Sequence, residues 1–285
     1  MKISSLHSYP VKSGRVIDLD ISLIDPLGLE NDRRWVIVQE GDDAELHAGR
    51  FISQRSHPQL ARLIAKPSKD TLELSYDWAS YTLDLRAPTQ MSSISVWKDD
   101  FAAAIYQDPV NDWLSKCLGG RVRLASLTGP TCRRRESNMR EEAFDMSFAD
   151  SYPILIATTA SLQAINDYVI GQGEAALPMA RFRPNIVING ALPWQEDSWK
   201  RIKIGEIVIE CVKPCTRCIM TTLDPNSGET RGNTSLDALT KLRRSADKRL
   251  KGVLFGTNAI SLGSGHIARG DKVEVIETQR PWPIA

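Results

Sequence analysis

Alternating apolar and polar positions in the first half of the chain predict β-strands. Apolar residues occupy every second position from residue 17 to residue 23, which is typical of a half-buried strand. A short apolar run at residues 35–38 and alternating runs at residues 72–76 and 81–85 follow. Short strands at this spacing, with turns between them, predict a barrel or a sandwich.

The sequence predicts fewer helices than strands, and residues typical of helix ends indicate where two of them begin or end. Asp108 and Pro109 suit the start of a helix, and Gly119 suits its end. Thr158 suits the start of a second helix, and leucines at helical spacing predict a third over residues 235–244.

The second half also contains strand patterns, at residues 154–157, 186–188 and 273–275, and a hairpin over residues 202–209 that turns near Gly205. The prediction is therefore a mainly β protein with a few helices. Between the two halves, the charged segment from Cys132 to Glu142 has the mixed signs of a solvated loop between domains.

Composition excludes several classes of protein. A net charge of +1 over 285 residues gives no general electrostatic case for a nucleic-acid partner or an anionic membrane. No run of about 18 apolar residues predicts a membrane-spanning helix, and the first residues do not form a signal peptide. An odd number of cysteines, five, without such a signal predicts reduced thiols and a cytoplasmic protein.

Cys215 and Cys218 lie three residues apart after a strand pattern, with Arg217 just before the second thiol. A thiolate near cationic groups is a good metal ligand, although two buried thiols at the end of a strand would give the same pattern. A structural zinc site would need a second pair of ligands, and a thioredoxin-like pair would need a helix after the cysteines. Both are poorly supported, and a single-thiolate metal site remains open.

Cations recur where predicted strands begin or end. Lys12 and Ser13 follow the first strand, Arg33 precedes the apolar run at residues 35–38, and Arg183 precedes another strand. A Lys-Ser-Gly turn and arginines at strand ends can bind phosphate oxygens. Each of these residues alone could equally be a solvated surface charge. The spaced glycines of a nucleoside-triphosphate site are absent.

Five ordered motifs together resemble the MOSC-domain molybdenum-cofactor proteins, specifically those with an N-terminal MOSC β-barrel domain, such as the mitochondrial amidoxime-reducing component and its bacterial relatives. The motifs are Tyr9-Pro10-Val11-Lys12-Ser13, Asp32-Arg33-Arg34-Trp35, Phe148-Ala149-Asp150-Ser151, Phe182-Arg183-Pro184-Asn185 and Lys213-Pro214-Cys215-Thr216-Arg217-Cys218. The resemblance implies an N-terminal β-barrel domain over residues 1–125 and a C-terminal MOSC β-barrel domain over residues 126–285.

The resemblance also implies a role for each matching residue. Cys218 matches the catalytic cysteine whose thiolate ligates molybdenum, whereas Cys215 matches a neighbour that does not ligate the metal. The positions that match groups holding the phosphate of the pterin cofactor are Lys12, Ser13, Arg33 and Arg183. The positions that match other residues of the cofactor pocket are Asp150, Ser151, Asn185 and Thr216.

The implied activity is that of an oxidoreductase containing the molybdenum cofactor (Mo-molybdopterin). It would reduce N-hydroxylated compounds such as hydroxylamines, amidoximes and N-hydroxylated bases. The alternative is a carrier of the cofactor, or a sulfur-transfer module with a persulfide on Cys218.

Some bacterial relatives carry a C-terminal iron–sulfur domain, but no cysteine follows Cys218 here. Electrons are therefore expected from a separate flavin or iron–sulfur reductase. The N-terminal targeting and membrane segment of the mitochondrial relatives is also missing, so that a cytoplasmic protein without a membrane partner is expected.

Overall fold

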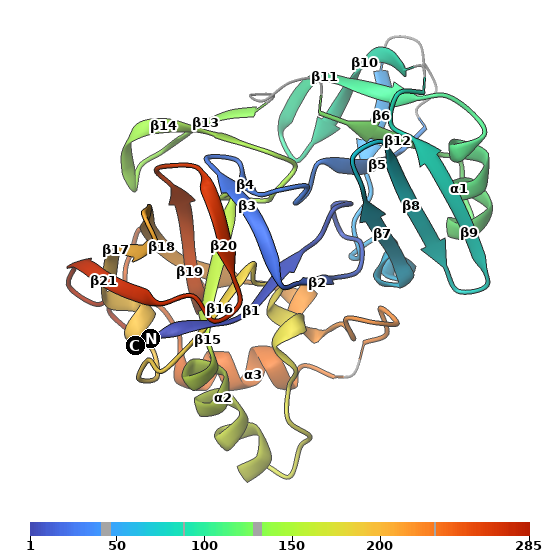
Figure 1. Ribbon diagram of the computed structural model, residues 1–285. Coiled ribbons are helices and arrows are strands. Elements are labelled where there is room, and N and C mark those ends of the chain that lie inside the picture. Colours follow the sequence, from blue (N-terminus) through green and yellow to red (C-terminus); the bar gives the residue numbers. More distant parts are fainter. Residues whose placement is uncertain (41–46, 88, 128–132, 231) are drawn as a thin grey trace.

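The computed structural model describes residues 1–40, 47–87, 89–127, 133–230 and 232–285. Within these ranges the strands form an eight-stranded sheet, a closed five-stranded barrel and three smaller sheets, and there are three α-helices. The prediction of a mainly β protein with a few helices is confirmed. Figure 1 shows two lobes, one built around the barrel and the other around the eight-stranded sheet.

The apolar run at residues 35–38 forms a strand of the closed barrel. The closed barrel consists of β10 (Thr89–Val96), β11 (Asp99–Tyr106), β12 (Val122–Ser126), β5 (Trp35–Gln39) and β6 (His47–Phe51). Val36 and Val38 pack in one core with Ile94, whereas Ile37 packs in a second core with Leu74. Because both faces of β5 are buried, its sequence is continuously apolar and does not alternate.

The second core of this lobe lies under one helix and a small sheet. Helix α1 (Val110–Leu118) ends at Gly119, whose φ of 73° is left-handed, as the sequence predicts for a helix end. The small sheet contains β7 (Leu63–Pro67), β8 (Thr71–Tyr76) and β9 (Ala79–Asp84).

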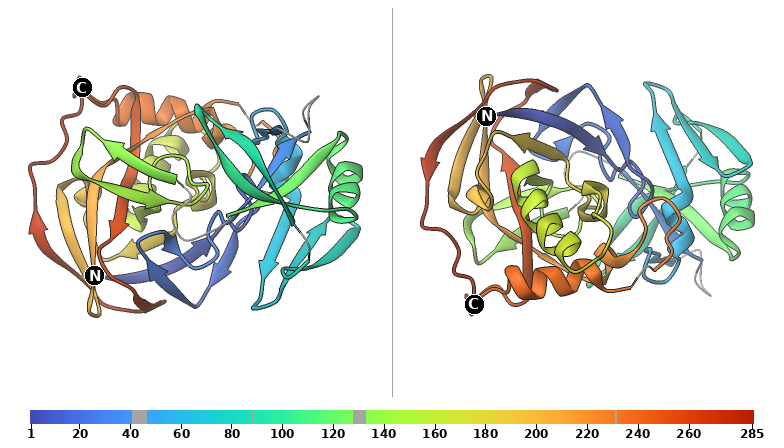
Figure 2. Two further views of the ribbon diagram at one scale, coloured as in Figure 1. Left: turned by 90° about the horizontal axis from the view of Figure 1, so that it is seen from above. Right: turned by 90° about the horizontal axis from the view of Figure 1, so that it is seen from below.

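The other lobe is a curved eight-stranded sheet with helices against it (Figure 2). In spatial order, its strands are β2 (Ile17–Leu19), β1 (Lys2–Ser8), β16 (Ile186–Asn189), β15 (Ile154–Thr158), β19 (Val253–Ser261), β18 (Ile207–Arg217), β17 (Trp199–Ile204) and β21 (Val273–Thr278). One face carries an isoleucine-rich core. On the other, residues of α2 (Thr159–Gly171) and α3 (Thr234–Leu242) pack with Phe182 and Phe255.

The start of α2 and the turn between β17 and β18 are as predicted. Thr158 is the N-cap of α2, and its hydroxyl oxygen accepts a hydrogen bond from the Ser161 backbone N–H at 3.1 Å. Gly205 has a φ of 56° at the turn of the β17–β18 hairpin. Within the described ranges, no helix has both the length and the apolar character needed to cross a bilayer.

The N-terminal strands belong to the lobe of the eight-stranded sheet, although the barrel follows them in the chain. Strand β1 pairs with β16, and β3 (Ile21–Asp25) pairs with both β4 (Gly28–Leu29) and β20 (Gly265–Ala268). The first 29 residues therefore complete sheets whose other strands come from the second half of the chain. The division into domains at residues 125 and 126 stays a prediction.

The charged segment between the halves is not a solvated loop, and that prediction was wrong. Its described part forms a hairpin of β13 (Arg133–Ser137) and β14 (Arg140–Met146), while Cys132 lies outside the described residues. Arg133 is 4% exposed and donates to the backbone carbonyls of Ser147 and Ala149 and to Asp99. Mixed charge looks solvated in a sequence, but here carbonyls and a carboxylate satisfy the buried guanidinium.

Candidate functional site

A cavity of about 790 Å³ lies between the two lobes. Its wall brings together all nine residues that the sequence singles out: Lys12, Ser13, Arg33, Asp150, Ser151, Arg183, Asn185, Thr216 and Cys218. They come from five motifs spread over more than 200 residues, so only the tertiary structure makes them neighbours. Their placement in one cavity is a finding, whereas the roles of the individual residues remain predictions.

Two arginines that line this cavity stack on one buried tyrosine, Tyr9. The Cζ atoms of Arg33 and Arg183 lie 4.3 Å and 4.1 Å from the centroid of the Tyr9 ring. Burial raises the pKa of Tyr9 to about 12. Burial also lowers the pKa of Arg183 to about 10, and the charge of Arg33 acts in the same direction. Two cations held this close together form a ready site for an anion.

The buried Asp32 holds Tyr9 and Arg33 in place through hydrogen bonds. Its side chain is fully buried, and its carboxylate accepts hydrogen bonds from the Tyr9 backbone N–H at 2.8 Å and from Arg33 Nη1 at 2.5 Å. Burial acts to lower the pKa of Arg33, but Asp32 and Tyr9 outweigh it and raise that pKa. Asn185 Oδ1 also accepts a hydrogen bond from Arg33, at 3.2 Å.

The backbone at the cavity is unusual. Ser13, Arg33, Trp97 and Arg183 all have positive φ angles, between 49° and 66°, although none is glycine. Such left-handed residues carry strain, and they cluster at ligand-binding and active sites. Here the left-handed backbone at each of these positions turns the chain at the cavity wall.

Lys12 lies beside Asp150 at the same cavity. Its buried Nζ donates to the Phe148 carbonyl oxygen at 2.8 Å and forms an ion pair with Asp150. Burial lowers the pKa of Lys12, and Asp150 opposes this shift. Desolvation acts to raise the pKa of Asp150. The charge of Lys12 and the hydrogen bond from Trp97 Nε1–H to Asp150 Oδ1, at 3.0 Å, outweigh it and hold that pKa well below its usual range. Asp150 is therefore a carboxylate that orients the Lys12 ammonium.

The predicted metal ligand lies where β18 ends. Cys218 is exposed, and its Sγ accepts a hydrogen bond from Arg55 Nη2 at 3.0 Å. The neighbouring Cys215 Sγ accepts one from Arg217 Nη1 at 2.9 Å. Each thiol thus has its own guanidinium donor, and hydrogen bonds to a ligand sulfur are a common feature of metal–thiolate sites.

Neither alternative for the cysteine pair gains support. A 3₁₀ turn over Ile219–Thr222 follows Cys218, whereas a thioredoxin-like pair needs an α-helix there. Over the described part of the chain, no group of three or more His, Cys, Asp or Glu side chains is arranged to hold a metal ion. The thiolate of Cys218 would therefore need ligands from a cofactor to complete a metal centre.

Sequence reasoning gave no role to three cavity residues that contact Cys218, Asp150 or Cys215. Arg55 belongs to the turn after β6, and Trp97 to the tip of the β10–β11 hairpin. Arg217 was part of a motif but received no role. Of the three, only Arg217 had a sequence signal, since it directly precedes Cys218.

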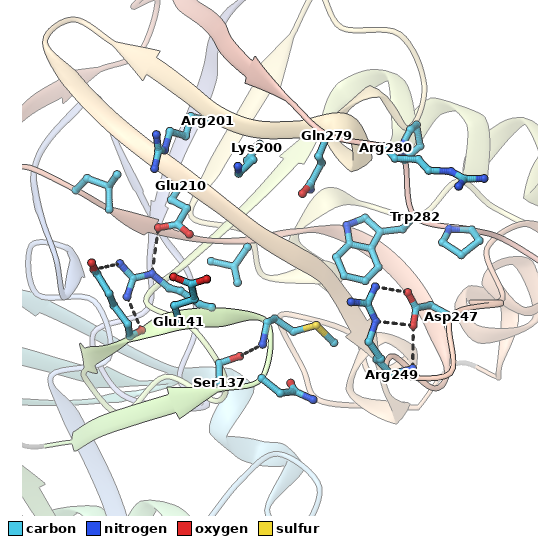
Figure 3. A pocket seen from close by; sticks show the side chains of 18 residues that line it. Ser137, Glu141, Lys200, Arg201, Glu210, Asp247, Arg249, Gln279, Arg280 and Trp282 are labelled. Atoms are coloured by element: carbon cyan, nitrogen blue, oxygen red, sulfur yellow. Dashed lines mark hydrogen bonds and ion pairs between the residues drawn. The ribbon is translucent and has the colours of Figure 1, made fainter.

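The residues fit a phosphate-bearing metal cofactor. A cavity of about 790 Å³ can hold a ligand of that size. Cations, polar groups and a soft sulfur donor all line its wall. A larger cavity of about 1250 Å³, between the β13–β14 hairpin and residues 279–283, contains none of the nine predicted residues (Figure 3).

Two family models match successive parts of the chain. The model of the MOSC N-terminal beta barrel domain matches residues 1–121, and the model of the MOSC domain matches residues 143–274. The chain belongs to the MOSC-domain proteins with an N-terminal MOSC β-barrel domain. This confirms the resemblance that the five motifs indicate, and the barrel fold agrees with it.

Several curated proteins are similar to this MOSC protein over most of its length. It is 28% identical to mitochondrial amidoxime-reducing component 1 of Xenopus laevis, over 95% of this chain and 81% of the relative. It is 27% identical to the Homo sapiens protein of that name, over 96% and 82%. It is also 27% identical to the molybdenum cofactor sulfurase of Oryza sativa subsp. japonica, over 96% of this chain but 34% of the sulfurase. The name of the sulfurase associates this relative with the molybdenum cofactor.

Proposed function

We propose that this MOSC protein is a molybdenum-dependent reductase of N-hydroxylated compounds. The observation that carries the proposal is a single cavity whose wall contains an exposed thiol beside Arg55 together with several lysines and arginines. The similarity to amidoxime-reducing components supports the same reading. In this proposal, a separate flavin or iron–sulfur reductase supplies the electrons.

In this proposal, different residues of the cavity bind different parts of the cofactor. Cys218 ligates molybdenum through its sulfur, and Arg55 hydrogen-bonds to that sulfur. Lys12, Ser13, Arg33 and Arg183 bind the phosphate of the pterin. The residues that line the remaining wall are Asp150, Ser151, Asn185 and Thr216. When bound, the cofactor supplies the two-electron chemistry that removal of oxygen from an N–OH group requires.

The first experiment is a measurement of metal and activity together. The protein is produced in a host that makes the cofactor, and its molybdenum content and its reduction of benzamidoxime with an artificial electron donor are measured. The proposal expects about one molybdenum per chain and turnover. Metal without turnover would contradict the reductase and leave a cofactor carrier.

The similarity to a molybdenum cofactor sulfurase supports one other candidate, a sulfur-transfer module. In that case Cys218 would carry a persulfide. Mass spectrometry of the unreduced protein distinguishes the two, because a persulfide adds one sulfur atom to the peptide that contains Cys218. A molybdenum-free protein with that added mass would favour sulfur transfer over reduction.

Replacement of Arg183 by asparagine should weaken cofactor retention. Asparagine tolerates the left-handed backbone at this position, where φ is 52°, so the change removes the guanidinium with little added strain. A charge-assisted hydrogen bond to phosphate contributes about 1.5–3 kcal/mol. We expect molybdenum per chain to fall at least severalfold after purification, by elemental analysis. Arg134→Asn, at an exposed hairpin position outside this cavity, is the control and should retain the metal.

A further inference from the structure

Cations are in excess over carboxylates in the site cavity. Its described wall contains eight lysine and arginine side chains but only two carboxylates, those of Asp99 and Asp150. Both carboxylates are already paired, with Arg133 and Arg135 and with Lys12 respectively. The larger cavity of Figure 3 differs, since Arg140 pairs there with Glu210 and Arg249 with Asp247.

Three of the cations in this wall have no carboxylate partner among the described residues, and one of them, Arg55, contacts Cys218. Arg55, Lys98 and Lys251 line the cavity, and none of them has an ion pair with a carboxylate in the described part of the chain. The proposed function assigns the phosphate of the cofactor to three other cations of the wall, Lys12, Arg33 and Arg183.

Arg55 is held in place by its neighbours. Its Cζ lies 4.8 Å from the centroid of the Trp97 ring, and one of its N–H groups donates to Cys218 Sγ. A guanidinium has five N–H donors in a fixed plane, so donors remain for a ligand that reaches Cys218. Trp97 is itself fixed by Phe51, at 5.0 Å between ring centroids, and by its hydrogen bond to Asp150.

The two lysines approach from opposite lobes. Lys98 follows Trp97 in the two-residue tip of the β10–β11 hairpin, where Val96 pairs with Asp99. Lys251 lies two residues before Val253, which pairs with Arg217, the residue preceding Cys218. Both lysines are exposed, and their flexible stems allow the ammonium groups to meet a ligand between the lobes.

We infer that Arg55, Lys98 and Lys251 form an anion subsite beside Cys218, so that the preferred N-hydroxylated substrates carry a carboxylate or a phosphate. This inference rests on the proposed reductase function. A neutral substrate would leave three cations without a partner at the site, whereas an anionic one gains charge-assisted hydrogen bonds from them. The same field also steers anionic molecules toward the cavity.

A matched pair of substrates tests the subsite on the molybdenum-loaded protein. Benzamidoxime and 4-carboxybenzamidoxime differ by one carboxylate. We expect kcat/KM for the carboxylate to exceed that for the neutral compound by about tenfold at low salt. The ratio should fall toward one in the double variant Lys98→Gln/Lys251→Gln and in high salt, where exposed charges are screened. Arg55 is left unchanged because it contacts Cys218.

Lys248→Gln is the control, because this nearby exposed lysine does not line the cavity and should leave the ratio unchanged. Calorimetric binding of both compounds to the oxidised protein, without an electron donor, gives a second readout that should show the same preference. Equal kcat/KM and equal binding, or a preference that survives in the double variant, would overturn the subsite alone. Failure of the metal-loaded protein to reduce either compound would overturn the proposed function together with it.

Discussion

Replacing Cys218 by serine should reduce turnover of N-hydroxylated substrates to background while the protein stays folded. A serine hydroxyl is a poor ligand for a metal that prefers thiolate, and it also removes the sulfur to which Arg55 donates. The side chain is exposed at the end of β18, so its loss leaves no cavity in a core. Activity with an artificial donor and thermal unfolding of the same preparation measure the two effects.

Cys215→Ser separates the two thiols of the motif. Cys215 interacts with Arg217, not with Arg55, and the resemblance gives it no role as a ligand. We expect this variant to keep its molybdenum and most of its activity. Substantial turnover in Cys218→Ser, or equal losses in both variants, would contradict the assignment of Cys218 as the metal ligand.

The second large effect is expected at Asp32. Asp32→Asn replaces one buried carboxylate oxygen by an NH₂ group, so that the side chain can no longer accept from both Tyr9 and Arg33. Breaking a buried ion pair in this way typically costs about 3–5 kcal/mol in the free energy of unfolding. Cofactor content should fall as well, because Arg33 then loses the group that orients it. Urea unfolding and elemental analysis measure the two losses.

Asp145→Asn provides the comparison for that change. Asp145 forms an ion pair with Arg134, whose side chain is 67% exposed, so its loss should lower the free energy of unfolding by at most about 1 kcal/mol. Similar losses in both variants would mean that the pair behind the cavity contributes no more than a surface pair.

The sequence predicted elements that rest on local patterns. The hairpin over residues 202–209 and the cap at Thr158 were predicted because alternation and capping act between near neighbours in the chain. The nine residues of the cavity were found through their motifs, and the tertiary structure then brought them together. Most of them lie just before a strand begins or close to where one ends.

Other residues of the site could not be predicted from the sequence, for a physical reason. Arg55 and Trp97 become neighbours of the cavity only because the barrel lobe folds against the second lobe. The periodicity of apolar residues indicates local secondary structure, and it does not predict such a contact between distant segments. The β13–β14 hairpin was mistaken for a loop because its buried arginine, Arg133, is compensated by backbone carbonyls outside the hairpin.

The pairing of β1 with β16 has a consequence for the order of events during synthesis. Lys2 pairs with Asn189, so the first strand leaves the ribosome long before its partner exists. At bacterial or eukaryotic rates of elongation, this delay is on the order of ten to forty seconds. The barrel strands, from Trp35 to Ser126, can meet one another during this time. The wall that contains Lys12 and Cys218 is completed only after Asn258 has been synthesised, and insertion of the proposed cofactor would therefore have to follow the synthesis of that residue.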